Sequence, residues 1–299
     1  MSTTVKPFLK WAGGKTQLLG EIEKLYQLDG VNKYVEPFIG GGAVFFDILN
    51  KHKFDEIYIN DVNKDLICTY TIVRDQIDDL LDLLAKFQEE YTSFDFDSEF
   101  EQRKKYYLAK RSRFNQLKVD NNSDCNLEKA ALLIFLNKTC FNGLYRVNKS
   151  GLYNVPMGKY KKPVICDAEN LRAVSKCLQG VTISCGRYDN LAKHIDKNTF
   201  VYCDPPYRPL TPTAAFTSYT ENDFDDNEQR NLSEFARLMS EKGTKIVISN
   251  SDPKNIDEND NFFDDLYAGF NIKRVKAGRM INSKGTARGK ISELLISNF

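Results

Sequence analysis

The sequence predicts an α/β protein with a mostly parallel, doubly wound sheet. Segments rich in strand-forming residues alternate along the chain with segments of helical apolar periodicity, which is the pattern of βαβ units. A glycine run at 40–42 follows the first strand, and Glu36, Asp61 and Asp204 stand at strand ends. Because open α/β sheets bind ligands beyond the carboxyl ends of their strands, we expect the functional site there.

The N-terminal part predicts a helix at 17–26, then a strand, a glycine loop and a helix over 33–46, and a strand at 56–61. The glycine loop lacks the G-x-G-x-x-G spacing of dinucleotide-binding folds. Asp61 lies about twenty residues beyond it, where nucleoside-cofactor folds bind ribose hydroxyls; a tight turn with a helix cap is the alternative. Gly-Lys-Thr at 14–16 does not complete a P-loop, because Leu9 replaces the required glycine.

The middle of the chain is predicted to be helical over 64–137, with clear apolar periodicity at 66–87 and 130–136 and a polar loop at 120–126. Residues 141–156 predict a β-hairpin with its turn near 149–151. Basic, amide and aromatic side chains on a rigid hairpin could enter a DNA major groove, where arginine pairs with guanine. The alternative is an ordinary hairpin held together by its aromatic residues.

The C-terminal part supplies the remaining strands of the predicted sheet. We expect strands at 181–185, 200–204 and 245–250, a loop at 208–220 and a helix at 226–239. A final pair of strands at 272–275 and 291–297 brackets a basic loop.

The strand at 200–204 runs into the sequence Asp204-Pro205-Pro206-Tyr207. Proline fixes φ and has no backbone N–H, so the carbonyls near Asp204 and Pro205 are expected to stay free of the next strand. A carboxylate, a free carbonyl and the flat ring of Tyr207 suit a planar molecule with an exocyclic amine, such as adenine. Two acceptors on the amine favour the pyramidal nitrogen that attacks an electrophilic methyl group. The alternative is a turn that merely ends a strand.

Charge is balanced overall but uneven along the chain. The 299 residues carry a formal net charge of +1, yet 138–163 and 270–290 contain basic residues and no acidic ones. Such tracts could follow a phosphate backbone. The alternative is that they are solvated loops.

The cysteine and histidine residues of the chain argue against metal sites and against His-dependent nucleophilic catalysis. The seven cysteines are scattered without a C-x-x-C spacing, so we expect free thiols and no metal site. With two histidines, Ser/His or Cys/His nucleophilic catalysis is not favoured. No apolar run is long enough to span a membrane and no signal peptide is visible, so we expect a cytoplasmic protein.

Six collinear motifs resemble those of Dam-type (alpha group) DNA-(adenine-N6) methyltransferases, including the GATC-specific methylases of restriction-modification systems. The motifs are F-L-K-W-A-G-G-K at 8–15, V-E-P-F-I-G-G-G at 35–42, I-N-D at 59–61, F-N-G-L-Y-R-V-N at 141–148, N-V-P-M-G-K-Y-K at 154–161 and D-P-P-Y at 204–207. Phe141 stands where some relatives have tyrosine, Lys159 replaces an arginine, and 66–126 matches no motif.

The resemblance implies a class I methyltransferase (Rossmann-like) sheet that uses S-adenosyl-L-methionine. It assigns a catalytic domain to 1–63 and 163–299, and a target-recognition domain of helices and a β-hairpin to 64–162. The implied cofactor-binding residues are Trp11, Lys15, Glu36, Phe38, Gly40, Asp61, Tyr188 and Asp204. The implied catalytic residues are Asp204, Pro205, Pro206 and Tyr207. The implied DNA-binding residues are Lys10, Phe141, Asn142, Leu144, Arg146, Asn148, Pro156 and Lys159.

In similar GATC enzymes, residues matching Leu144, Arg146 and Pro156 read thymine and guanine, the one matching Phe141 wedges into the duplex, and the one matching Lys10 contacts the first guanine. The expected activity is methyl transfer to adenine N6 of double-stranded DNA, within GATC, by base flipping. A bacterial or phage origin and a separate cognate restriction endonuclease are also implied. The alternatives are an RNA or protein-amide methyltransferase and a non-catalytic DNA-binding protein.

Overall fold

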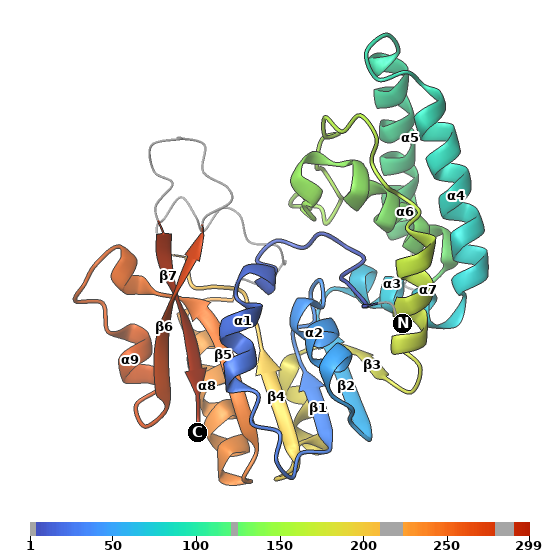
Figure 1. Cartoon of the computed structure of the whole chain (residues 1–299). Coiled ribbons are helices and arrows are strands. Elements are labelled where there is room, and N and C mark those ends of the chain that lie inside the picture. Colours follow the sequence, from blue (N-terminus) through green and yellow to red (C-terminus); the bar gives the residue numbers. More distant parts are fainter. Residues whose placement is uncertain (1–3, 121–124, 210–223, 279–289) are drawn as a thin grey trace.

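A computed structural model describes residues 4–120, 125–209, 224–278 and 290–299. Its centre is one seven-stranded sheet with the order β3-β2-β1-β4-β5-β7-β6 (Figure 1). The strands are β1 (Lys33–Glu36), β2 (Glu56–Asp61), β3 (Thr182–Cys185), β4 (Thr199–Cys203), β5 (Lys245–Ser251), β6 (Asn271–Gly278) and β7 (Lys290–Ser297).

The first five strands run parallel, and β7 lies antiparallel between β5 and β6. The chain therefore has the predicted α/β class, with a mostly parallel, Rossmann-like sheet. The centre of the sheet is β1, which pairs with β2 on one side and β4 on the other. Successive strands are added outward from β1 toward β3 on one side and from β4 toward β5 on the other, so the strand order reverses between β1 and β4. At such a reversal, open α/β sheets leave a crevice for ligands.

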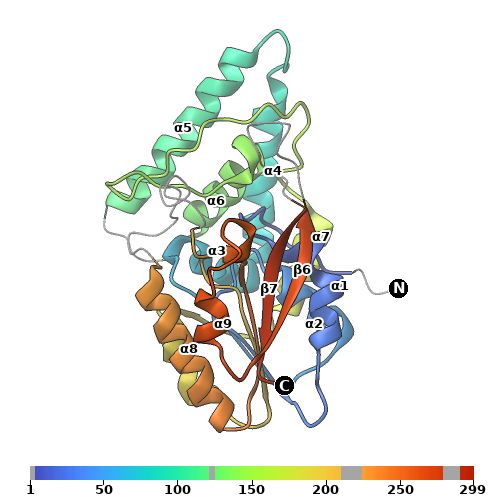
Figure 2. The same cartoon turned by 90° about the vertical axis from the view of Figure 1, so that its left-hand side faces the viewer.

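The described helices follow or precede the strands and cover both faces of the sheet. They are α1 (Leu19–Ile22), α2 (Ala43–Lys51), α3 (Lys64–Asp75), α4 (Ile77–Ser93), α5 (Phe100–Val119), α6 (Leu127–Thr139), α7 (Ala168–Cys177), α8 (Asp226–Glu241) and α9 (Phe262–Leu266). Figure 2 shows α8 and α9 on one face of the sheet and α1 and α2 on the other.

The sheet is buried on both faces because successive strand residues point to opposite sides. In β4, Phe200 and Tyr202 pack in the core that contains α2, whereas Val201 and Cys203 pack in the core that contains α8. All four are fully buried. The continuous apolar run of β4 is therefore what a central strand of a covered sheet requires.

The helical stretch predicted at 64–137 is divided into α3, α4, α5 and α6. Polar residues cap two of these helices: Asn63, before α3, accepts hydrogen bonds from the amides of Asp65 and Leu66, and Asn126, before α6, accepts one from that of Lys129. Gln76 and Glu99, before α4 and α5, make no side-chain cap. Every residue from 130 to 136 is buried, because α6 packs against α3, α4 and α5. Figure 1 shows α4, α5 and α6 standing above the sheet.

Two local predictions need correction. The helix expected at 17–26 is interrupted, with α1 flanked by 3₁₀ turns at Lys15–Gln17 and Glu23–Leu25. The hairpin expected at 141–156 has its turn in the expected place, where the Gly151 amide donates to the Asn148 carbonyl at 2.9 Å. Its two limbs, however, form no regular strands: they are joined by isolated antiparallel bridges at Cys140–Met157 and Val147–Tyr153 and by a few further backbone hydrogen bonds.

The expectation of free thiols is wrong for two cysteines. Cys68 of α3 and Cys125, just before α6, form a disulfide with their Cα atoms 4.9 Å apart. The other five are free. Spacing could not indicate this pair, because 57 residues separate its members. Within the described part of the chain, no helix has the length and apolar character needed to cross a membrane.

Candidate active site

Three acidic residues lie along the carboxyl edge of the sheet. Glu36 is the last residue of β1, Asp61 is the last of β2, and Asp204 directly follows β4. Because β1 is paired in register with both β2 and β4, the three side chains occupy neighbouring positions at this edge. Among the described residues, no group of three or more His, Cys, Asp or Glu side chains could hold a metal ion.

Asp204 is held by a lysine from the N-terminal segment. Lys15 Nζ lies 2.8 Å from Asp204 Oδ1, with the two side chains 4% and 21% exposed. Burial raises the pKa of Asp204, and the Lys15 ammonium partly opposes this effect. The same ammonium lies 4.6 Å from the centre of the Tyr207 ring, whose hydroxyl donates to Glu293 Oε2 of β7 at 2.7 Å. A carboxylate, a cation and an aromatic ring therefore share one small space.

The backbone after Asp204 is fixed by two buried amide side chains that the sequence did not indicate. Gln229 of α8 donates to the Pro206 carbonyl at 3.0 Å and accepts a hydrogen bond from Asn250 of β5 at 3.0 Å. Asn250 also accepts from the Arg208 amide at 3.2 Å. Among the described residues, no side chain or loop amide donates to the Pro205 carbonyl. The Pro205 carbonyl is therefore held in place by the hydrogen bonds of the residues that follow it, while its own oxygen accepts no side-chain or loop hydrogen bond from the described residues.

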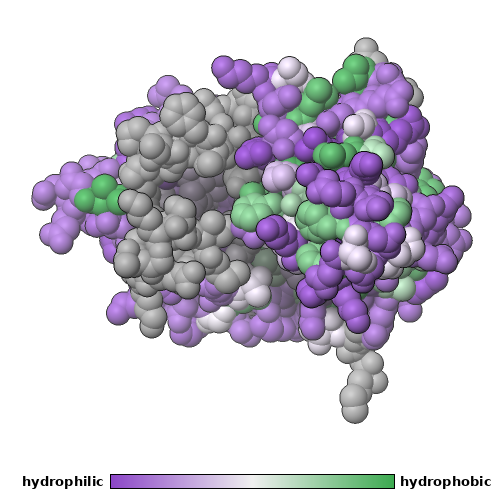
Figure 3. Space-filling model, turned by 90° about the horizontal axis from the view of Figure 1, so that it is seen from above, coloured by the Kyte–Doolittle hydropathy of each residue, from purple (hydrophilic) through white to green (hydrophobic). Residues whose placement is uncertain are grey.

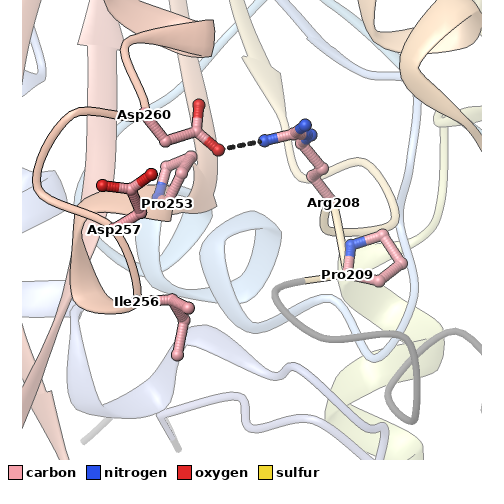
Figure 4. Close-up of a pocket in the computed structure, with 6 residues that line it drawn as sticks. All are labelled: Arg208, Pro209, Pro253, Ile256, Asp257 and Asp260. Atoms are coloured by element: carbon pink, nitrogen blue, oxygen red, sulfur yellow. Dashed lines mark hydrogen bonds and ion pairs between the residues drawn. The ribbon is translucent and has the colours of Figure 1, made fainter.

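Arg208 continues this support on the other side of the turn. Its guanidinium pairs with Asp226 at the start of α8 and with Asp260, each at 2.8 Å. Figure 4 shows the Arg208–Asp260 pair across a pocket of about 130 Å³ that also includes Pro209, Pro253, Ile256 and Asp257. The predicted loop 208–220 lies outside the described residues from position 210 onward.

Glu36 is the most enclosed of the three acids, at 2% exposed. The Tyr34 hydroxyl donates a short hydrogen bond to its carboxyl group. Burial raises the pKa of Glu36 well above its usual range, although Tyr34 and Lys15 oppose the effect. Burial and the Tyr34 hydroxyl therefore act on the pKa of the Glu36 carboxyl in opposite directions.

The glycine loop wraps around Asp61 and Trp11. The Gly40 amide donates to Asp61 Oδ2 at 3.0 Å and the Asn63 amide to Oδ1 at 2.9 Å. Burial raises the pKa of Asp61, whereas these amides lower it. A Cβ on Gly41 would stand 2.9 Å from the Cβ of Trp11, and Gly40 has φ 46°. Glycine is needed here because Trp11 and the backbone approach so closely.

Phe38 and Tyr188 form an aromatic wall beyond β1 and β3. Their ring centres are 5.3 Å apart, and Tyr188 also packs edge-on against Phe235 of α8 at 5.4 Å. Phe38 is half-buried, and Tyr188 is only 4% exposed. Phe38 is therefore the more accessible of the two rings for packing against a ligand at this edge of the sheet.

The residues expected to contact DNA in 141–156 differ in how they are held. Phe141 is 52% exposed and its amide donates to the Pro156 carbonyl. Arg146 is exposed and its Nε donates to Asn154 Oδ1 at 2.7 Å. Asn148 instead accepts from two amides of the turn, those of Ser150 and Leu152, each at 3.0 Å. Its side chain therefore shapes the turn.

Asn142, Leu144, Pro156 and Lys159 complete the expected set of this segment. Asn142 is exposed and adopts a left-handed backbone, with φ 55°. Leu144 is half-buried, whereas Pro156 and Lys159 are exposed.

Asn137, a residue that sequence reasoning missed, connects Lys10 of the N-terminal stretch to the 141–156 segment. The buried Asn137 side chain accepts from the Lys10 amide at 2.8 Å and donates to the carbonyls of Lys10 and Gly143 at 2.7 and 2.9 Å. The Lys10 ammonium lies 4.5 Å from the ring centre of Tyr160. The signal that could have indicated Asn137 is a lone amide in an otherwise apolar helix.

A basic pocket of about 460 Å³ opens beside Lys10. Its lining residues are Lys10, Lys138, Lys159, Tyr160, Lys161, Lys162, Pro163 and Val164. Burial lowers the pKa of Lys138, and the nearby charge of Lys10 adds to the effect. Figure 3 shows the molecule from above, where hydrophilic residues predominate among those that are coloured and apolar groups are scattered between them.

In the second basic tract, at 270–290, two of the cations that could have followed a phosphate backbone instead form ion pairs with acidic residues of the protein. Lys273 pairs with Glu21 at 2.8 Å, and Arg274 pairs with Asp252 and Asp264 at 3.1 and 2.7 Å. These two cations neutralise neighbouring acids. Residues 279–289 of the tract lie outside the described part of the chain.

Residues 11–281 match the model of the family described as D12 class N6 adenine-specific DNA methyltransferase. The chain belongs to this family. The matched range contains Lys15, the glycine loop, Asp61 and the Asp204 turn. This methyltransferase therefore acts on DNA at adenine N6, and methyltransferases of its family generally use S-adenosylmethionine.

Relatives of this methyltransferase span nearly its full length. It is 48% identical to a type II methyltransferase of Methanocaldococcus jannaschii, over 99% of both chains. It is 37% identical to a type II methyltransferase of Lactococcus lactis, over 99% of this chain and 96% of the relative. It is 35% identical to the DNA adenine methylase of Vibrio cholerae, over 97% and 95%. These names support a site-specific, adenine-directed DNA methyltransferase.

Proposed function

We propose that this enzyme transfers a methyl group from S-adenosyl-L-methionine to adenine N6 within GATC in double-stranded DNA. The supporting observation is the pair of acceptors at the turn after β4. Lys15 forms an ion pair with Asp204 Oδ1, and among the described residues no further donor reaches either carboxylate oxygen, and no side-chain or loop donor reaches the Pro205 carbonyl. An adenine amine has two hydrogens, one for the carboxylate and one for the carbonyl.

Catalysis by this geometry is mainly positioning. Asp204 and the Pro205 carbonyl hold the amine so that its lone pair leaves conjugation with the ring, and Tyr207 stacks on the base. The bound cofactor supplies an electrophilic methyl group on a sulfonium. The N6–methyl bond forms as the sulfur–methyl bond breaks, with the electron pair moving to sulfur. The extra proton on N6 is then acidic enough to leave to water, so no strong base is required.

The residues at the carboxyl edge of β1 and β2 fit the cofactor. Gly40 and Gly41 let Trp11 pack directly against the loop backbone, and the half-buried Phe38, beside Tyr188, supplies an aromatic ring on which an adenine could pack. Asp61 stands at the end of β2, where it can meet ribose hydroxyls after exchanging its backbone donors. We therefore assign these residues, with Lys15 and Glu36, to the cofactor side of the site.

We assign residues 64–162 to target recognition and the remainder to catalysis. The exposed Phe141 and Arg146 on a buried helical support suit a wedge and a guanine reader, with Leu144 and Pro156 beside them. The lysine-lined pocket suits phosphate. The target base must leave the duplex to reach Asp204, at a cost of a few kcal/mol.

The decisive experiment is incubation of the enzyme with methyl-tritiated cofactor and either duplex DNA, RNA or protein. Label in N6-methyladenine of the duplex is expected, and protection of the same DNA from nucleases that cut unmethylated GATC identifies the sequence. Label in cytosine, RNA or glutamine amide, or no label at all, would overturn the proposal. An Asp204→Ala enzyme serves as the blank, because it lacks the carboxylate acceptor.

A restriction endonuclease acting separately on the same sequence is the partner we propose, because two relatives are type II methyltransferases. Co-expression with a GATC-cutting nuclease tests whether this methyltransferase can serve as the partner of such an enzyme. The methyltransferase should protect the host DNA, and cleavage of the host DNA would contradict the proposed pairing.

A further inference from the structure

Tyr145 lies between two residues assigned to base reading, yet its own side chain points into the protein. It is 6% exposed, whereas Arg146 is exposed and Leu144 half-buried. In an extended backbone, successive side chains point in opposite directions. The anchorage of Tyr145 therefore decides which way Leu144 and Arg146 project.

The hydroxyl of Tyr145 ends in a buried ion cluster. It donates to Asp65 Oδ2 at 2.7 Å, and Lys118 Nζ lies 2.7 Å from the same oxygen. Lys129 Nζ lies 2.8 Å from Asp65 Oδ1. Asp65, Lys118 and Lys129 come from α3, α5 and α6, so the cluster joins three helices to the reading segment.

The ring of Tyr145 makes a second contact, with Trp11, which lies against the glycine loop at 40–42. We call this loop the cofactor loop, because we assign it to the cofactor side of the site. It stacks on Trp11 with ring centres 5.5 Å apart and an interplanar angle of 25°. Trp11 in turn lies against the glycine loop, within 3.0 Å of where Cβ atoms of Gly40 and Gly41 would stand. One buried tyrosine thus touches both the wall of the cofactor loop and the support of the reading segment.

Asp65 is linked to the glycine loop at 40–42 through Asp61 and Asn63, which shortly precede it in the sequence. Asp61 receives the Gly40 amide, and Asn63 both donates to Asp61 and caps α3 at Asp65. The glycine loop is therefore connected to Tyr145 by two sets of contacts, through Trp11 and through Asp65.

We propose that Tyr145 is a positioning residue that couples occupancy of the cofactor loop to sequence discrimination by Leu144 and Arg146. The inference rests on the proposed function. By linkage, cognate DNA must then strengthen cofactor binding by the same factor by which cofactor strengthens cognate DNA binding.

The test compares wild type with Tyr145→Phe, which keeps the stack on Trp11 and loses the hydroxyl, and with Tyr145→Leu, which loses both. Tyr106→Phe is the matched control, because it removes a similar hydroxyl bond, to Glu90 at 2.6 Å, within the same helical region. Two quantities are measured: kcat/KM on a cognate duplex relative to one with a single base pair changed, and cofactor affinity by calorimetry with and without cognate duplex.

We expect Tyr145→Leu to lower both the discrimination ratio and the DNA-induced gain in cofactor affinity by about fivefold to tenfold. Tyr145→Phe should lower them by a smaller factor, and Tyr106→Phe should leave them unchanged. If Tyr145→Leu does not fold, Tyr145→Phe decides: a ratio and a gain equal to those of wild type overturn the proposal. Loss of thermal stability with both quantities unchanged also overturns it, because it shows a purely structural role.

The two levels of proposal fail separately. If wild type methylates its duplex and the Tyr145 variants keep full discrimination and coupling, only this inference is wrong. A wild-type enzyme that labels no duplex overturns the proposed function, and this inference with it.

Discussion

The ammonium of Lys15 lies 2.8 Å from the carboxylate of Asp204, so a residue near the N-terminus forms an ion pair with a turn 189 positions later in the sequence. Burial raises the pKa of Asp204 and Lys15 opposes that rise. A carboxylate accepts hydrogen bonds from an amine best when it is ionised. Lys15 therefore maintains the acceptor that the proposed reaction needs.

Replacement of Lys15 by methionine should shift the pH dependence of catalysis. Without the cation, burial acts unopposed and the pKa of Asp204 rises further. The active, ionised form exists above that pKa and is lost as pH falls through it, so the acid limb of kcat should move to higher pH. Lys24→Met, which removes an exposed partner of Glu21, is the control. An acid limb at the same pH in wild type and Lys15→Met would contradict the assignment.

Gln229→Leu should slow methyl transfer while leaving cofactor affinity nearly unchanged. The variant removes the donor to the Pro206 carbonyl and the partner of Asn250. Misplacement of the turn should lower kcat by about tenfold to a hundredfold. Single-turnover rates and calorimetric cofactor titration separate the two effects. The exposed Asn231→Ala on the same helix should behave as wild type; equal rates in all three proteins would refute the supporting role.

Gly41→Ala should weaken cofactor binding. Its new Cβ would stand 2.9 Å from the Trp11 Cβ, so the tryptophan or the loop must shift. We expect about a tenfold loss of affinity, since a displaced loop of this kind costs roughly 1–3 kcal/mol. Gly20→Ala is the matched control, because a Cβ there meets nothing within 4 Å. Unaltered affinity in Gly41→Ala would show that the loop does not border the cofactor.

Arg146→Ala should relax discrimination at one guanine. A bidentate arginine contributes about 1–3 kcal/mol against the wrong base, so the preference for the cognate pair at that position should fall by about tenfold or more. Methylation rates on duplexes with each base pair of the site changed in turn measure the effect. Arg113→Ala in α5 controls for the loss of a positive charge, because it removes an exposed ion pair with Glu128 of α6. Full preference in Arg146→Ala would mean that another residue reads that guanine.

The sheet could be predicted from sequence because its signals are local. The apolar run of β4 and the abrupt stop at Pro205 lie within a few residues of each other, and parallel strands place Glu36, Asp61 and Asp204 at one edge. The hairpin was only half predictable. Its turn depends on Gly151 and Asn148, which are adjacent to it, whereas the pairing of its limbs depends on packing against the helices.

The supports of the site could not be predicted, because each depends on a partner far away in sequence. Asn137 reaches Lys10 across 127 residues, and Asn250 reaches Gln229 across 21. Tyr145 meets Asp65 across 80. A buried amide or tyrosine in an apolar context indicates that a partner exists, but periodicity carries no information about which one.

Strands β2 and β3 are hydrogen-bonded neighbours, with Tyr58 opposite Thr182, although residues 62–181 separate them in the chain. The long excursion between them leaves and re-enters the sheet at adjacent points, so it forms a cassette with two closely spaced ends. If residues 64–162 read the target as we propose, exchange of this segment between enzymes of this architecture is expected to change the DNA sequence that is methylated while the sheet that carries Asp204 stays the same.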